Sequence, residues 1–142
     1  MFIKSTSKEC NKLFPFDQLT KIQSDNLTIY KTSIGNRSLE VLIGDLKDNQ
    51  PKISTYLKNI HAIYQDPFSP KKNPTLWSKD WFETLKNISS SDVILSTYSA
   101  SHSVHQNLEA AGWNVYRAPG FAHKRSSTRA TLKEGVYSGP IK

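Results

Sequence analysis

Residues 60–77 read IHAIYQDPFSPKKNPTLW, and this segment sets the expected architecture of the chain. Its first part, Ile60–Tyr64, is a short apolar run of the kind found in buried and often parallel strands. The run ends before Asp66, and Pro67 and Pro70 then exclude a regular element. We therefore predict a strand followed by a loop that carries an acid, an aromatic ring and two lysines.

Helical and strand patterns alternate after this loop, which is typical of an α/β fold. The first predicted helix has an N-cap at Ser78 and Asp80 in its first turn. Its apolar face is expected to hold Trp81, Phe82, Leu85 and Ile88. The later expected elements are, in order, a loop at Ser89–Ser91, a strand at Val93–Tyr98, a helix with Val104, Leu108 and Ala111 inward and Gly112 at its end, a strand at Trp113–Tyr116 and a last strand at Arg129–Leu132.

The amino-terminal side predicts fewer elements. Residues 1–26 are expected to be an irregular leader, and residues 27–142 the folded domain. Two β-rich runs follow the leader, Leu27–Tyr30 and Leu39–Ile43, with turn residues between them. Pro51 is expected to open a short helix, because its missing N–H is tolerated in a first helical turn.

Composition excludes several classes of protein. A length of 142 residues corresponds to about one domain, and 37% hydrophobic residues suffice for a core. The sequence has no apolar run of about 18 residues, so no transmembrane helix is expected. The single cysteine, Cys10, excludes disulfide scaffolds and cysteine-rich zinc modules. We expect a reduced, soluble and cytoplasmic protein.

The charge balance is basic, with 19 Lys and Arg against 12 Asp and Glu, a formal net charge of +7. Basic domains often bind phosphate backbones, because each neutralised phosphate releases counterions. Lys71, Lys72, Lys124 and Arg125 flank loop signals and are the cations of interest. A well-solvated basic surface without a ligand is the alternative.

The sequence gives little support for a metal site or for a catalytic nucleophile. His102 and His105 are three residues apart near a helix start, but no further ligand lies at a suitable spacing, and a metal site needs three or four. We expect both to lie in an exposed first turn and predict no metal site. Cys10 is expected to be an ordinary thiol, and no G-x-S-x-G hydrolase motif occurs.

The loop after Ile60–Tyr64 is the strongest candidate site, because open α/β sheets bind ligands at the carboxyl ends of their strands. Asp66 can orient an amine or accept its proton, and Phe68 can stack on a planar base. Lys71 and Lys72 can hold backbone phosphate. The alternative is a Pro-rich turn with solvated charges.

Gly44-Asp45 ends another predicted strand. An acid there can accept a hydrogen bond from an adenine amino group, or it can simply cap the next turn. Tyr98-Ser99, at the end of the clearest strand, is expected to complete a polar and aromatic rim along one sheet edge.

The segment from Ile63 to Trp77 resembles the signature of MnmC-type tRNA methyltransferase domains, in which a strand ends in D-G-F-x-P-x-K-N-P-x-x-W. Residues 95–100, 108–113 and 119–125 resemble later blocks of that family in the same order, and residues 39–45 resemble an earlier strand ending in G-D. The resemblance spans about residues 14–133.

This resemblance implies a Rossmann-like class I methyltransferase fold that uses S-adenosylmethionine. Such domains methylate the exocyclic amine of 5-aminomethyl-2-thiouridine at the wobble position, in the tRNA anticodon stem-loop. Asp66 is implied to contact the substrate amine, and Asp45 with Gly44 to lie near the cofactor adenine. The residues implied to shape the base pocket or meet the RNA are Phe68, Lys71, Lys72, Asn73, Lys124 and Arg125.

Two features depart from the family pattern. Pro67 stands where the family has glycine, which is expected to stiffen the loop. Residues 1–27 are not expected to supply the first strands, the Gly-rich turn or the ribose-binding acid of this fold, and the flavin-dependent oxidoreductase domain of bifunctional members is not expected either. We therefore expect a carboxyl-terminal half that needs its missing half, for which a second chain is one source. The alternatives are a non-catalytic tRNA-binding module and a structural domain whose basic surface has no function.

Overall fold

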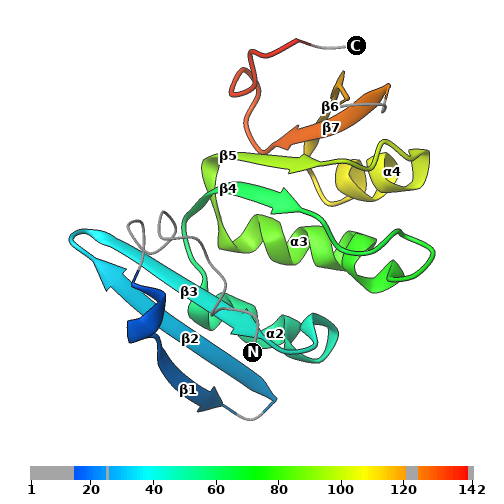
Figure 1. The fold of residues 1–142 in the computed structure, drawn as a ribbon. Helices are drawn as coiled ribbons and strands as arrows, with labels where there is room; N and C mark the ends of the chain where they lie inside the picture. The colour runs from blue at the N-terminus through cyan, green and yellow to red at the C-terminus, as the bar shows by residue number, and fades with distance from the viewer. Residues whose placement is uncertain (1–14, 25, 121–124, 141–142) are drawn as a thin grey trace. The chain divides into compact units, whose positions relative to one another are not determined.

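A computed structural model describes residues 15–24, 26–120 and 125–140 of the chain (Figure 1). The chain forms two compact units, Met1–Asn49 and Gln50–Lys142. Among the described residues, no helix is long and apolar enough to cross a membrane.

The first unit contains an antiparallel sheet in the order β1-β2-β3. Its elements are the 3-10 helix η2 (Phe16–Gln18), β1 (Thr20–Ser24), β2 (Leu27–Ile34) and β3 (Arg37–Ile43). The two strands predicted in this region are confirmed, and Gly35 takes a φ of +58° in the turn between them. The prediction of an irregular leader is wrong for residues 16–24. β1 is stabilised by ladder hydrogen bonds to β2, and these cannot be inferred from the polar sequence of β1 alone.

Helix α2 (Leu46–Tyr56) begins five residues earlier than the Pro51 signal predicts. The Asp45 carbonyl accepts hydrogen bonds from the Asn49 backbone N–H at 3.1 Å and from Asn49 Nδ2 at 2.7 Å. Asn49 is only 2% exposed, so its amide needs such a partner. These two bonds start the helix upstream of the proline, and the predicted start at Pro51 is wrong.

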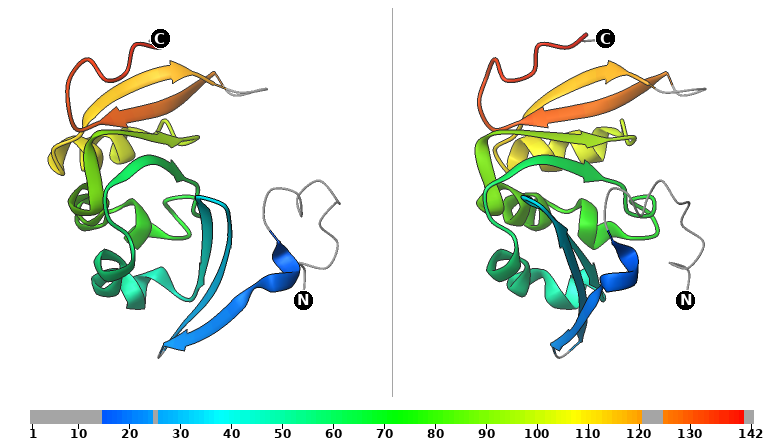
Figure 2. Two further views of the ribbon diagram at one scale, coloured as in Figure 1. Left: turned by 90° about the vertical axis from the view of Figure 1, so that its left-hand side faces the viewer. Right: turned by 60° about the vertical axis from the view of Figure 1, so that its left-hand side comes forward.

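The second unit is built on a sheet in the order β4-β5-β7-β6. Its elements are β4 (Ile60–Gln65), η3 (Pro74–Trp77), α3 (Lys79–Ile88), β5 (Ser89–Thr97), α4 (His102–Ala110), β6 (Asn114–Pro119) and β7 (Ser126–Thr131). β4 and β5 are parallel, and β7 runs antiparallel to both of its neighbours. Figure 2 shows α3 and α4 on the same side of this sheet. This agrees with the rule of right-handed crossovers, because the connections β4-α3-β5 and β5-α4-β6 both progress in the same direction along the sheet order. The predicted α/β class is confirmed.

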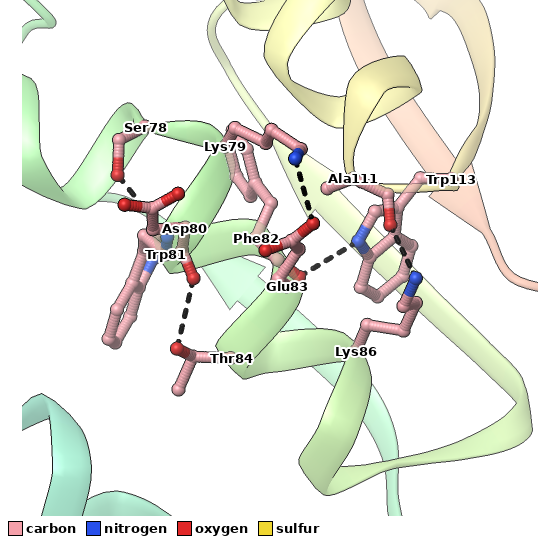
Figure 3. Close-up of polar contacts among 10 residues, drawn as sticks. All are labelled: Ser78, Lys79, Asp80, Trp81, Phe82, Glu83, Thr84, Lys86, Ala111 and Trp113. Carbon is pink, nitrogen blue, oxygen red and sulfur yellow. Dashed lines mark hydrogen bonds and ion pairs between the residues drawn. The ribbon is translucent and has the colours of Figure 1, made fainter.

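Helix α3 shows most clearly why the sequence folds as it does. Ser78 Oγ accepts a hydrogen bond from the Trp81 N–H at 3.2 Å, which confirms the predicted N-cap (Figure 3). The four residues predicted for its apolar face are all buried. Trp113 Nε1 donates to the Phe82 carbonyl at 3.1 Å, and Lys86 Nζ donates to the Ala111 carbonyl at 2.7 Å. The helix is thus tied to the segment that follows α4.

The core of this unit lies between the helices and alternate residues of β5. Val93 and Leu95 of β5 and Leu108 of α4 are fully buried. Gly112 has a φ of +86° directly after α4, which confirms its predicted place at the helix end.

Two strand predictions need correction. The apolar run Ile60–Tyr64 predicts a buried strand, yet Tyr64 is 85% exposed and His61 and Ala62 are also exposed. β4 stands at the end of the sheet order, so only one side of it is covered by a described strand. Ser89–Ser91 belongs to β5 rather than to a loop, because a register shift absorbs it: Ile60 pairs with Ser89, whereas Ala62 pairs with Ile94.

Candidate functional site

The segment Asp66–Asn73, called here the β4–η3 loop, connects the end of β4 to the 3-10 helix η3. As predicted, it contains no helix or strand. Its second half closes on itself, because the Ser69 carbonyl accepts hydrogen bonds from the backbone N–H groups of Lys72 at 2.8 Å and Asn73 at 3.0 Å. The two lysines are therefore carried on a closed turn.

Side chains from outside the loop hold its first half. Trp77 Nε1 donates to the Phe68 carbonyl at 2.7 Å, and the Tyr98 hydroxyl donates to the Pro67 carbonyl at 3.0 Å. The sequence predicted Tyr98 on the rim of the sheet and Trp77 in the family motif, but it predicted no hydrogen-bond partner for either side chain. A signal existed, since indole and phenol groups that are buried usually find an acceptor.

The side chains of the loop remain open to solvent. Asp66, Lys71 and Lys72 are exposed, Phe68 is 75% exposed, and Asn73 is partly buried. The structure thus places a carboxylate, an aromatic ring and two ammonium groups on one short segment. Such a set can hold an amine, stack on a base and contact phosphate.

Arg125 lies at the same edge of the sheet as this loop. β4 and β5 are parallel and end there, and antiparallel β7 begins there, as the pairing of Thr97 with Thr128 shows. Arg125 directly precedes β7 and is exposed. Lys124, the neighbouring predicted cation, lies outside the described residues.

Gly44 and Asp45 belong to the first unit, where they join β3 to α2. A Cβ on Gly44 would lie 2.8 Å from the Asn26 carbonyl oxygen and 3.0 Å from Leu27 Cδ1. Close packing within the first unit therefore explains why this position holds glycine. Asp45, which the resemblance implies near the adenine, is exposed and directly precedes α2.

His105 departs from its predicted exposure, whereas His102 is exposed as predicted. His105 Nε2 lies 2.7 Å from Thr128 Oγ1, which donates its single proton to the Ser99 carbonyl at 2.7 Å. His105 Nε2 is therefore the donor in this pair. His105 stands three residues before buried Leu108, and this spacing is the sequence signal for an inward position.

Burial lowers the pKa of His105 below its ordinary value of 6.5, and the nearby positive charge of Arg117 lowers the pKa further. Glu109 acts in the opposite direction, and His102 adds a small lowering effect. Within the described ranges, no group of three or more His, Cys, Asp or Glu side chains is arranged to hold a metal ion. Cys10 lies outside those ranges.

Comparison with known proteins identifies the family. A family described as "S-adenosyl-L-methionine-dependent methyltransferase" matches residues 11–133. The tRNA 5-methylaminomethyl-2-thiouridine biosynthesis bifunctional protein MnmC of Ralstonia nicotianae is 38% identical over 98 residues, which cover 69% of this chain and 14% of that protein. The MnmC protein of Leptospira borgpetersenii is 31% identical over 142 residues, covering 92% of this chain and 21% of the relative.

A solved structure gives the same result. The crystal structure of MNMC2 from Aquifex aeolicus superposes with a TM-score of 0.61 at 34% sequence identity, covering 78% of this chain and 35% of that one. The chain thus spans well under half of the length of these relatives. The predicted resemblance and fold class are confirmed. The chain belongs to the S-adenosyl-L-methionine-dependent methyltransferase family and matches the methyltransferase part of the MnmC proteins.

Proposed function

We propose that this chain acts in the transfer of a methyl group from S-adenosylmethionine to the aminomethyl group of 5-aminomethyl(-2-thio)uridine at the tRNA wobble position. The observation that carries the proposal is the β4–η3 loop, which carries both an exposed Asp66 carboxylate and an exposed Phe68 ring at the carboxyl edge of the sheet. The relatives are named for the biosynthesis of 5-methylaminomethyl-2-thiouridine in tRNA, and this supplies the substrate class.

Asp66 is the proposed catalytic residue. An alkylammonium has no free electron pair, so it must lose a proton before it can attack a methyl group. A neighbouring carboxylate can accept that proton and keep the free amine in line with the sulfonium. Bound S-adenosylmethionine would supply the methyl group and would leave as the neutral thioether, which keeps the electrons of the S–CH₃ bond. The methylated amine would then be positively charged and would lose its extra proton to solvent.

The other loop residues are proposed to bind the RNA. Phe68 would stack on the target base and Asn73 would hydrogen-bond to its polar edge, because splayed single-stranded bases are read in this way. Lys71 and Lys72 would contact backbone phosphates of the anticodon stem-loop. Arg125 at the same edge, together with Lys124, would extend this basic surface.

Gly44 and Asp45 are the residues proposed to lie at the cofactor. The exposed Asp45 carboxylate can accept a hydrogen bond from the adenine amino group, and Gly44 lets β3 turn closely past Asn26 just before this acid. S-adenosylmethionine supplies the electrophilic methyl group when bound. We place this action in the cytoplasm, where tRNA is modified, and we propose that a second chain can contribute the Gly-rich turn of the fold.

The proposal is tested with an anticodon stem-loop RNA that carries 5-aminomethyl-2-thiouridine, incubated with the chain and isotopically labelled S-adenosylmethionine. Mass spectrometry of the digested nucleosides identifies the product, and the same RNA with unmodified uridine is the control. Formation of 5-methylaminomethyl-2-thiouridine is expected, either from the chain alone or after a second chain with the Gly-rich turn is added.

Two other results decide between the alternatives. Salt-dependent binding of the stem-loop without methyl transfer in either arm would favour a non-catalytic tRNA-binding module. Absence of both binding and transfer would contradict the proposed function altogether.

A further inference from the structure

We propose that Trp77 and Tyr98 are positioning residues that together set the direction of the Asp66 carboxylate and the Phe68 ring. This inference rests on the proposed function for its catalytic consequence. The structural part rests on contacts within the second unit. Neither ring is proposed to touch the substrate.

The two donors hold adjacent peptide groups. The Pro67 carbonyl, bonded by the Tyr98 hydroxyl at 3.0 Å, belongs to the peptide group before the Phe68 Cα. The Phe68 carbonyl, bonded by Trp77 Nε1 at 2.7 Å, belongs to the peptide group after it. Peptide groups are planar, so a bond to the carbonyl on each side restrains φ and ψ of Phe68. The direction of its Cα–Cβ bond follows, so the side chain leaves the backbone in a set direction although it is 75% exposed.

Asp66 is fixed from both of its neighbours. Gln65 pairs with Thr97 in the sheet, and its Nε2 donates to the Leu76 carbonyl at 2.6 Å. On the other side, the ring of Pro67 disfavours the helical region for Asp66 and locks the φ of Pro67. The Tyr98 bond to the Pro67 carbonyl holds the next peptide group along the chain, the one between Pro67 and Phe68.

The donors are themselves held in place. Trp77 is 2% exposed, and its ring meets the Tyr98 ring edge-on, with centroids 6.1 Å apart and an interplanar angle of 87°. The Trp77 carbonyl accepts a hydrogen bond from Asn107 Nδ2 of α4 at 2.9 Å. Three segments (η3, the residue after β5, and α4) thus meet at this pair. The backbone of the loop is anchored to the core of the unit, while its reactive side chains stay in solvent.

A restrained loop backbone is expected to increase the rate of methyl transfer. In-line attack demands close alignment, and a displacement of about 1 Å can lower a rate about 100-fold. Proximity of Asp66 to the amine is therefore not sufficient; its direction must be set as well. Removing a bond to the Pro67 carbonyl should affect the chemical step more than the affinity for RNA or cofactor.

The test is Tyr98→Phe, which deletes the hydroxyl and keeps the ring that packs on Trp77. Tyr137→Phe is a matched control, because the Tyr137 hydroxyl also donates to a proline carbonyl, that of Pro140, at 3.0 Å. Two readouts are used: amide hydrogen exchange of Lys72 and Asn73, and methyl transfer to the modified stem-loop. Both amides donate to the Ser69 carbonyl, and Ser69 directly follows the segment that Tyr98 holds. In Tyr98→Phe, opening of this segment is expected to raise exchange at both amides by about fivefold, the value of one lost hydrogen bond.

In the same variant, kcat is expected to fall about tenfold, while KM for the RNA and for the cofactor stays within about twofold. Tyr137→Phe is expected to change neither readout. Trp77→Phe, compared with Trp113→Phe, repeats the exchange test for the indole, since Trp113 Nε1 also donates to a carbonyl, at 3.1 Å.

Amide exchange can be measured without enzymatic activity. The proposed function and the positioning role of Trp77 and Tyr98 can therefore be contradicted independently. A wild-type chain without methyl transfer would contradict the proposed function, whereas the exchange difference would still decide on the positioning pair. Equal loop exchange in Tyr98→Phe and Tyr137→Phe would overturn the positioning role. A fall in kcat that is matched by an equal rise in KM would overturn it too, because it would indicate a binding role.

Discussion

Asp66 and Phe68 combine a fixed backbone with solvent-exposed side chains. The carbonyls next to them are bonded by buried or partly buried aromatic donors, and Pro67 between them has a locked φ. A functional group is most effective when the residues around it, rather than the ligand, determine its direction. Pro67 in place of the family glycine therefore agrees with the other restraints on this loop.

At the residue scale, His105 predicts a pH dependence of stability. Its pKa in the folded protein lies below the ordinary value of 6.5, because the imidazolium would lose solvent and face Arg117. The unfolded chain then binds more protons as the pH falls through about 6.5, so the folded state loses stability on acidification. The His105→Gln variant is expected to show a smaller fall in Tm between about pH 7.5 and about pH 5.5.

Differential scanning calorimetry at the two pH values checks this expectation. His102→Gln, which removes an exposed imidazole from the same helix, is the control and is expected to retain nearly the wild-type slope, because His102 is the smallest of the effects on the pKa of His105. An identical pH slope in His105→Gln and the wild type would show that His105 does not contribute.

At the scale of elements, the two helices of the second unit differ in their caps. Ser78 Oγ accepts the Trp81 N–H at the start of α3, whereas Ser101 at the start of α4 makes no side-chain capping bond. Ser78→Ala is expected to lower the free energy of unfolding by about 1 kcal/mol. Ser101→Ala is expected to lower it by less than about 0.5 kcal/mol. Urea denaturation of the two variants measures the difference, and equal losses would contradict the assigned cap.

The same helices show what the sequence predicts well. The start of α3 and its buried face follow from Ser78 and from apolar spacing, which are local properties. The exposure of β4 and the inclusion of Ser89–Ser91 in β5 depend on which strands pair and in what register, and these are properties of the whole sheet. Pro51 misled the prediction of α2 because the bonds to the Asp45 carbonyl start that helix upstream.

At the scale of the whole molecule, the net charge of +7 predicts salt-dependent RNA binding. If the β4–η3 loop contacts phosphates, Lys71→Gln with Lys72→Gln should weaken binding. Their loss should also reduce the slope of log K against log salt by about 1.4, the value for two contacts to a single strand. Fluorescence anisotropy with a labelled anticodon stem-loop measures this slope.

The control removes the same charge from the opposite edge of the sheet. Lys58 precedes β4 and Lys133 follows β7, so both lie at the edge where β4 begins, and both are exposed. The Lys58→Gln, Lys133→Gln variant is expected to keep the wild-type slope within about 0.4, which is well below one contact. Equal slopes for the two double variants would mean that RNA binds through the overall charge and not through the loop.

Only part of the candidate site could be predicted from the sequence. The acid, the ring and the lysines of the loop are contiguous in sequence, so their grouping follows from the segment itself. The bonds from Trp77 and Tyr98 require contacts across 9 and 31 residues, and only the fold brings those partners together. The hydrogen-bond partner of His105, which is 23 residues away, was missed for the same reason.

The most direct measurement is single-turnover methyl transfer to the modified stem-loop by Asp66→Asn and by Asp92→Asn. Each change removes one exposed carboxylate from the second unit: Asp66 lies in the loop at the carboxyl edge of the sheet, and Asp92 lies in the first half of β5. Asp66→Asn is expected to lower the rate by about 100-fold or more with unchanged RNA affinity, because the amide cannot accept the amine proton. Asp92→Asn is expected to transfer methyl at the wild-type rate. Equal rates in both variants would contradict a site of methyl transfer at this loop.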